Sequence, residues 1–246
     1  MTAAADRSAS LAPAGHEPHD VSRETTGLAP AAPPAARAFF GDHLEVMTAY
    51  ASLLAGAGVE RGLIGPREVP RLWDRHLLNC AVVAELIRSG AAVDDVGSGA
   101  GLPGMVLALI RPDLEVTLVE PLLRRATFLT EAVGQLGLGN VSVVRERAED
   151  RARRRAGAAD VVTARAVAPL GRLVGWCLPL VRPGGCLLAF KGQTADAEVE
   201  AARADLRRAG AASVEVLKVG AGVVEPATTV VRVVPGAVPR RARRRP

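Results

Sequence analysis

Four regularly spaced glycines stand between an acidic segment and an apolar one. They are Gly97, Gly99, Gly101 and Gly104, within the stretch VDDVGSGAGLPGMVLAL. Glycine loses more conformational entropy on folding than any other residue, so such a cluster is typical of a turn whose bare backbone approaches a ligand. In a strand, turn and helix unit, free N–H groups and the positive end of the helix dipole face a negatively charged group. The alternative is a turn with an architectural role only.

Acidic residues beside the glycines narrow the choice of ligand. Asp94 and Asp95 end the expected first strand, where they would repel a dinucleotide pyrophosphate and attract an ammonium group. Glu120 ends the expected second strand, and an acid in that place accepts hydrogen bonds from both ribose hydroxyls. A ligand with a ribose, a carboxylate and an ammonium group describes S-adenosylmethionine better than NAD. The alternatives are an exposed turn residue for Asp94 and a helix N-cap beside Pro121 for Glu120.

Three further sites carry basic side chains that could meet an anionic substrate. Arg75 and His76 lie on an expected helix, either contacting a guanine or a phosphate or serving as a surface Arg and a core His. Arg165 ends an expected strand, where parallel α/β sheets bind their ligands. Lys191 ends another strand and would meet a phosphate or lie on the surface.

Alternating strands and helices must position these residues. Strands are expected at residues 91–96, 114–120, 141–146, 160–167, 186–192, 213–219 and 228–234. Helices are expected between them at residues 104–110, 121–137, 168–181 and 197–210. Apolar β-branched strands that alternate with helices predict an α/β fold with a doubly wound, mostly parallel sheet. The last two strands have no helix between them and are expected to form a hairpin.

The chain divides into four predicted segments. Residues 1–36 are rich in Ala and Pro without periodicity and are expected to be a disordered arm. Residues 37–90 carry apolar side chains at helical spacing, and residues 91–235 form the sheet domain. Residues 236–246 are expected to be a basic disordered tail whose five arginines would neutralise phosphates. The run at 145–155 mixes Arg with acids and is expected to be a solvated loop.

Composition limits the class of protein. The net charge of +5 favours polyanionic partners, although an excess of Arg over Lys is also typical of a GC-rich genome. Cys80, Cys177 and Cys186 form no C-x-x-C pair, so we expect buried thiols in a reducing compartment and no metal site. Without an apolar run of about 18 residues or a secretory signal, the expectation is a cytoplasmic protein with no membrane span. A monomer is also expected.

Several motifs together resemble one known family. They are RLWDRHLLN at 71–79, DVGSGAGLPG at 95–104, TARAVAPL at 163–170 and LAFKGQ at 188–193. Over about residues 37–234 the chain resembles the glucose-inhibited division protein B family of bacterial 16S ribosomal RNA (guanine-N7) methyltransferases. It departs from the family's usual pattern in GLIGPREVP, before the R-H helix, and in Asn79-Cys80 after it. The outer wall of the substrate pocket is therefore less defined than the cofactor site.

The resemblance implies a class I S-adenosylmethionine-dependent methyltransferase, a Rossmann-like fold with seven strands and a small N-terminal helical extension. It also implies that Gly97, Leu102, Ala148, Glu149 and Arg165 contact the cofactor. The predicted cofactor site is completed by Asp95, Gly99, Gly101 and Glu120. The implied target is N7 of a guanine in the 530-loop region of 16S ribosomal RNA, as RNA or in the 30S subunit.

This chemistry requires orientation more than acid or base catalysis. Guanine N7 has a free lone pair that attacks a sulfonium methyl without prior deprotonation, and orientation contributes several kcal/mol. We therefore expect no indispensable catalytic acid or base, and Arg75, His76 and Lys191 are candidates for positioning the substrate. The alternatives are a methyltransferase of another RNA or a small molecule, and a non-catalytic RNA-binding or assembly protein. An NAD-linked dehydrogenase fits least because no second catalytic domain is present.

Overall fold

A computed structural model describes residues 28–236, and its strands form one seven-stranded sheet. The strands are β1 (Ala92–Val96), β2 (Glu115–Val119), β3 (Val141–Val144), β4 (Ala159–Arg165), β5 (Val181–Lys191), β6 (Ala211–Val219) and β7 (Thr228–Pro235). Their order across the sheet is β3-β2-β1-β4-β5-β7-β6, and β7 runs antiparallel to the other six strands. The predicted mostly parallel sheet and the terminal hairpin are both confirmed.

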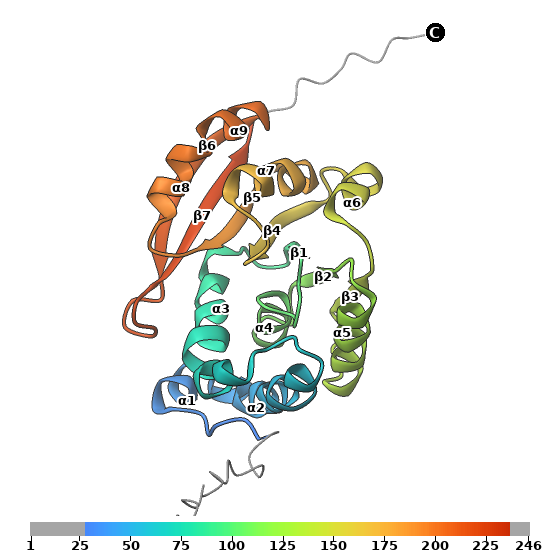
Figure 1. Ribbon diagram of the computed structural model, residues 1–246, viewed down its shortest axis with the longest axis vertical. Coiled ribbons are helices and arrows are strands. Elements are labelled where there is room, and N and C mark those ends of the chain that lie inside the picture. The colour runs from blue at the N-terminus through green and yellow to red at the C-terminus, as the bar shows by residue number, and fades with distance from the viewer. Residues whose placement is uncertain (1–27, 237–246) are drawn as a thin grey trace, which may run out of the picture.

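Helices cover the two faces of this sheet in two layers (Figure 1). One layer holds α1 (Pro34–Phe40), α2 (Leu44–Leu53), α3 (Asn79–Ala81), α4 (Gly104–Ile110) and α5 (Leu123–Gln135). The other holds α6 (Ala148–Arg155), α7 (Leu170–Cys177), α8 (Ala195–Ala201) and α9 (Arg203–Arg208). Because successive side chains of a strand point to opposite faces, Val161 packs in the first layer and Val162 in the second. Each face of the sheet therefore has its own apolar core.

The N-terminal helical segment belongs to the first of these cores. Its helices are broken into short α, 3-10 and π turns. A 3-10 turn at Pro66–Arg71 is followed by a π turn at Leu72–Leu78, then by α3, and then by a 3-10 turn at Val82–Leu86. Tyr50, Leu72 and Leu77 are fully buried in the same cluster as Val93 of β1. The segment therefore packs as part of the α/β domain.

Ordered structure starts before the predicted boundary at residue 37. Helix α1 begins at Pro34, and Ala36 is fully buried. Proline is well tolerated at the first helical position because that residue's N–H has no partner within the helix. The Trp73 indole Nε1 also donates to the Pro30 carbonyl at 2.7 Å. Residues 1–27 of the predicted arm and residues 237–246 of the predicted tail lie outside the described residues.

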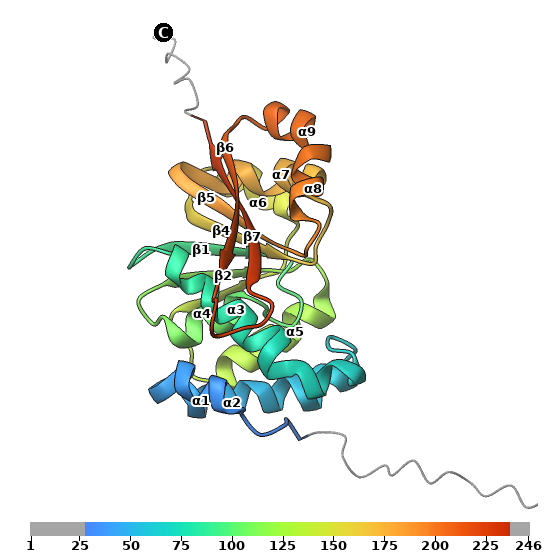
Figure 2. The same ribbon diagram turned by 90° about the vertical axis from the view of Figure 1, so that its left-hand side faces the viewer.

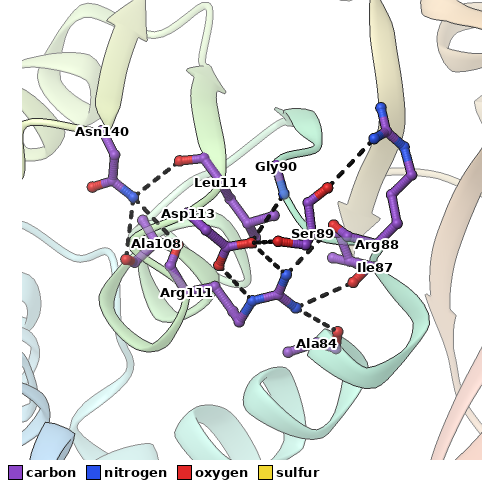
Figure 3. Close-up of polar contacts among 10 residues, drawn as sticks. All are labelled: Ala84, Ile87, Arg88, Ser89, Gly90, Ala108, Arg111, Asp113, Leu114 and Asn140. Atoms are coloured by element: carbon purple, nitrogen blue, oxygen red, sulfur yellow. Dashed lines mark hydrogen bonds and ion pairs between the residues drawn. The ribbon is translucent and has the colours of Figure 1, made fainter.

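A polar cluster ties the end of the helical segment to the sheet domain (Figure 3). Arg111 donates to the carbonyl oxygens of Ala84 at 3.2 Å and Ile87 at 3.1 Å, which closes the C-terminal end of the last helical turn. It also forms an ion pair with Asp113, whose other partners are the Ser89 hydroxyl and the Gly90 amide. The Arg111 guanidinium holds the pKa of Asp113 well below its usual range.

The turn between β6 and β7 extends beside α3, as both ribbon views show (Figures 1 and 2). A Cβ atom placed on Gly220 would lie 2.6 Å from a Val82 side-chain carbon, so only glycine allows this close approach. The Thr228 hydroxyl donates to the Asn79 carbonyl at 3.2 Å. The hairpin thus supports the helical segment that carries Arg75 and His76.

Two other predictions concern the described residues as a whole. Cys80, Cys177 and Cys186 are all buried and free, as expected of small apolar core residues. Among residues 28–236, no helix combines the length and the apolar character that crossing a membrane requires.

Candidate functional site

The glycine turn connects β1 to α4 at the carboxyl end of the sheet. Gly97, Gly99 and Gly101 have φ angles of +68°, +61° and +97°, a region in which side chains other than hydrogen are strained. A Cβ on Gly97 would lie 2.7 Å from a Val167 methyl, whereas the nearest atom to a Cβ on Gly99 is 3.8 Å away. The turn is therefore closed against the protein at Gly97 and more open at Gly99, where a Cβ would make only an ordinary van der Waals contact.

Asp95 braces this turn from inside. Its Oδ1 accepts a hydrogen bond from the Thr163 hydroxyl at 2.8 Å, and its Oδ2 accepts one from the Gly104 amide at 3.1 Å. Burial raises the pKa of this fully enclosed carboxyl to about 6, although the hydrogen bonds lower it in part. Gly104 is the first residue of α4, and its amide already donates to Asp95. The positive end of the α4 dipole therefore stabilises the carboxylate of Asp95.

Glu120 holds the open side of the turn. Its carboxylate is 1% exposed, with Oε2 accepting from the Gly99 amide and Oε1 from the Leu122 amide, each at 3.0 Å. The hydrogen bond from the Leu122 amide is the contact expected if Glu120 caps the start of the following helix. The hydrogen bond from the Gly99 amide ties the end of β2 to the glycine turn. A carboxylate has about four acceptor sites, so two remain for hydroxyl donors. A ribose beside Gly99 fits this arrangement.

Asp94 lies on β1, as predicted, but its carboxylate pairs with a side chain of the protein. It is 5% exposed, and Arg151 on α6 grips it with Nε at 2.5 Å from Oδ2 and Nη2 at 2.7 Å from Oδ1. The segment 145–155, predicted as a solvated loop, contains the helix Ala148–Arg155. The physical reason is that a buried carboxylate requires a charged, hydrogen-bonded partner, and only folding this segment against the sheet supplies it.

The same ion pair fixes two predicted cofactor residues. Ala148 is the first residue of α6 and is 7% exposed, and Glu149 follows it, partly exposed. Arg151, one turn later, also donates to Glu146 at 3.3 Å, so both ends of this turn are held against β1. The start of α6 thus faces the edge that the glycine turn and Glu120 share.

Tyr50 is part of this arrangement, although no motif in the sequence points to it. Its side chain is fully buried, and its hydroxyl donates to the Ala100 carbonyl in the glycine turn at 2.8 Å. Burial raises the pKa of Tyr50 well above its ordinary value, so the phenol keeps its proton. Leu102, the last predicted residue of the turn, is itself buried in the core that Tyr50 shares.

A cavity of about 400 Å³ opens at the carboxyl ends of β4 and β5. Its walls include Arg75, Arg165 and Lys191, together with the apolar side chains of Val167 and Phe190. Three basic residues that are far apart in sequence are therefore brought together, beside the Val167 side chain that also contacts Gly97.

Arg165 and His76 interact directly. Arg165 donates to the Arg75 carbonyl and to Nδ1 of His76, both at 2.9 Å, and to Sγ of Cys80 at 3.1 Å. The other ring nitrogen of His76 lies 2.8 Å from a Glu68 carboxylate oxygen. Both nitrogens of His76 thus have protein partners, which argues against direct contact with a guanine or phosphate.

Lys191 is neither a free cation nor a surface residue. Its side chain is 9% exposed, and Nζ donates to the Glu198 carboxylate at 2.7 Å and the Ala168 carbonyl at 3.1 Å. Glu198 also accepts from the Leu170 amide, so this pair joins α7, α8 and the end of β5. Much of the Lys191 charge is balanced inside the protein.

Comparison with known proteins agrees with this geometry. Residues 43–225 match the model of the GidB family, described as rRNA small subunit methyltransferase G. The chain belongs to this family. Relatives named ribosomal RNA small subunit methyltransferase G include one from Thermobifida fusca, 64% identical over 81% of this chain and 83% of its own. One from Salinispora tropica is 58% identical over 89% of this chain and 96% of its own.

Solved structures share the fold at much lower sequence identity. A putative S-adenosyl-L-methionine-dependent methyltransferase from Methanococcus maripaludis, 12% identical, aligns with a TM-score of 0.52 over 78% of this chain and 95% of its own. A SAM-dependent methyltransferase from Aquifex aeolicus, 20% identical, aligns with a TM-score of 0.50 over 69% and 98%. The predicted family and the class I, Rossmann-like methyltransferase fold are confirmed.

Proposed function

We propose that this protein transfers a methyl group from S-adenosylmethionine to N7 of a guanine in the 530-loop region of 16S ribosomal RNA. It acts on the RNA or the 30S subunit, as a cytoplasmic monomer. The observation that carries the proposal is the glycine turn, in which the buried Glu120 carboxylate accepts from the Gly99 amide and ties the end of β2 to the turn. Relatives named as small-subunit ribosomal RNA methyltransferases are matched over 83% and 96% of their own length.

The residues present fit S-adenosylmethionine. When bound, this cofactor supplies an electrophilic methyl group on a sulfonium centre. Glu120 would accept the ribose hydroxyls, the bare backbone at Gly99 would admit the methionine end, and Gly97 would hold the turn against Val167. Ala148 and Glu149 would flank the adenine. Asp95 acts indirectly, since its oxygens hold Thr163 and Gly104.

The protein's part in the reaction is to orient the base. Guanine N7 needs no deprotonation, and the cavity at β4 and β5 offers the apolar surfaces of Val167 and Phe190 to a flat ring. Arg75 on its wall would attract the phosphates of the RNA, and Arg165 beside it would contact the cofactor. Cys80, whose thiol contacts Arg165, is buried with a raised pKa and is thereby disfavoured as a nucleophile.

The test is methyl transfer itself. Purified protein is incubated with methyl-labelled S-adenosylmethionine and 30S subunits or 16S RNA from cells that lack this modification, and labelled 7-methylguanine is mapped. Label at one guanine in the 530 loop is the expected result. Label at another nucleotide would overturn the proposed target, and cofactor binding without label on either substrate would favour a different RNA or small molecule.

A further inference from the structure

Three side chains from separate elements form a hydrogen-bonded chain that ends at the cavity. Glu68 lies on the 3-10 turn Pro66–Arg71, His76 on the following π turn, and Arg165 at the end of β4. His76 contacts Glu68 through Nε2 at 2.8 Å and Arg165 through Nδ1 at 2.9 Å. We call this chain the Glu68–His76–Arg165 relay. Its middle member is 12% exposed.

The partners define the protonation state of His76. A guanidinium only donates hydrogen bonds, so Nδ1 must accept from Arg165 and carry no proton. The single ring proton is then on Nε2, where it is donated to the Glu68 carboxylate. Only the neutral imidazole with this tautomer satisfies both contacts.

We propose that His76 is a positioning residue that acts through Arg165, with its neutral ring holding the guanidinium at the cavity wall. Arg165 also donates to the Arg75 carbonyl and Cys80 Sγ, so its contacts with His76, Arg75 and Cys80 all go to one short helical segment. The orientation of Arg165 therefore depends on where residues 75–80 lie. The expected effect of the relay on cofactor binding rests on the proposed function, whereas the hydrogen bonds of the relay do not depend on that function.

The charges around His76 make the relay sensitive to acid. The groups that face it are Glu68, Arg75 and Arg165, with Arg71 acting on Glu68. Burial and the Arg165 charge lower the pKa of His76, and the contact with Glu68 raises it in part, so the ring is neutral at pH 7. A second proton would turn Nδ1 into a donor that faces another donor. Acidification is thus expected to release Arg165 from the ring.

The first test needs no cofactor. Nitrogen-15 NMR of the imidazoles is recorded against pH, with His76→Asn identifying the His76 signals among those of the four histidines. The relay predicts the Nε2–H tautomer at pH 7 and a pKa below the ordinary value. Arg165→Ala should raise this pKa and Glu68→Gln should lower it. A proton on Nδ1, or a His76 pKa that is the same in wild type and Arg165→Ala, would overturn the relay.

The second test asks whether the relay affects ligand binding. The affinity for S-adenosylmethionine is measured by calorimetry at pH 8 and pH 5, and the wild type should bind about tenfold more weakly at pH 5. His76→Asn keeps an acceptor but does not titrate, so the part of the loss at pH 5 that comes from His76 should disappear. Any part that comes from protonation of Asp95, which braces the glycine turn, should remain. His76→Leu should bind S-adenosylmethionine weakly at both pH values. Adding His76→Leu to Arg165→Ala should cause no further loss of affinity. His43→Asn, a histidine outside the relay, is the matched control.

The outcomes separate the relay from the proposed function. If the wild type binds no cofactor at any pH, the proposed function fails, and the NMR titration alone decides the relay. If the cofactor binds and His76→Asn keeps the full acid dependence of the wild type, His76 does not position Arg165 for binding. Thermal melting of each variant at both pH values identifies any that fail to fold, in which case His76→Asn carries the comparison.

Discussion

The buried pair Asp94–Arg151 allows a prediction with a defined magnitude. Both side chains are less than a tenth exposed and meet through two hydrogen bonds of 2.5 and 2.7 Å. The substitution Arg151→Met keeps the length and apolar stem but leaves the Asp94 carboxylate buried without its main partner. Removing one member of such a pair costs about 3–5 kcal/mol. We therefore expect the free energy of unfolding to fall by that amount.

Urea denaturation followed by circular dichroism measures the loss. With an m value near 3 kcal/mol per M, a loss of about 3 kcal/mol lowers the midpoint by about 1 M. The matched control is Arg153→Met, two residues away on α6, whose exposed pair with Asp150 should contribute little. The double variant Asp94→Val/Arg151→Met should recover much of the loss because no unpaired charge remains. A midpoint for Arg151→Met equal to that of Arg153→Met would refute the reasoning.

Three further predictions concern the glycine turn. Gly97→Ala places a Cβ 2.7 Å from Val167 at a positive φ. Calorimetry should therefore show loss of S-adenosylmethionine binding, and urea denaturation should show a lower midpoint. Gly184→Ala, with a φ of +81° and no atom within 4 Å of the added Cβ, controls for the backbone strain alone. Tyr50→Phe removes a buried hydrogen bond and should cost about 1–2 kcal/mol in urea unfolding, whereas an unchanged midpoint would show that the bond is dispensable. The folded-state pKa of Asp95 is raised to about 6, so the contribution of Asp95 to stability is complete below pH 4 and is lost as the pH rises through 6. The loss amounts to about 3 kcal/mol, and Asp95→Asn should remove it. The measurement is the difference in unfolding free energy between wild type and Asp95→Asn as a function of pH.

The sheet could be predicted from sequence because its signals are local. In strands such as Glu115–Val119, apolar side chains alternate with polar ones or follow one another without a break, and turn residues stand on both sides. The spacing of the glycines marks the turn after β1. The contact of Glu120 with this turn also follows from its place at the end of a parallel strand, where neighbouring ends meet.

Other features depend on contacts that no local pattern encodes. Helix α6 has almost no apolar face, so its sequence resembles a solvated loop until Arg151 is seen to pair with Asp94, 57 residues away. Tyr50 reaches the turn across 50 residues, and its neighbours in sequence give only a helical pattern. His76 was predicted as a substrate contact or a core residue, and neither prediction included Arg165 as its partner.

The position of β7 has a consequence for synthesis of the chain. It is the last of the described strands, yet it lies between β5 and β6 inside the sheet. A ribosome that has made the chain only as far as β6 therefore carries a sheet whose β5 edge has unpaired N–H and C=O groups, available to other strands. Thr228–Pro235 covers this edge by pairing with β5, and β6 joins the sheet only through β7. An unpaired strand edge of this kind favours aggregation, so pairing with β7 also protects the chain from other strands.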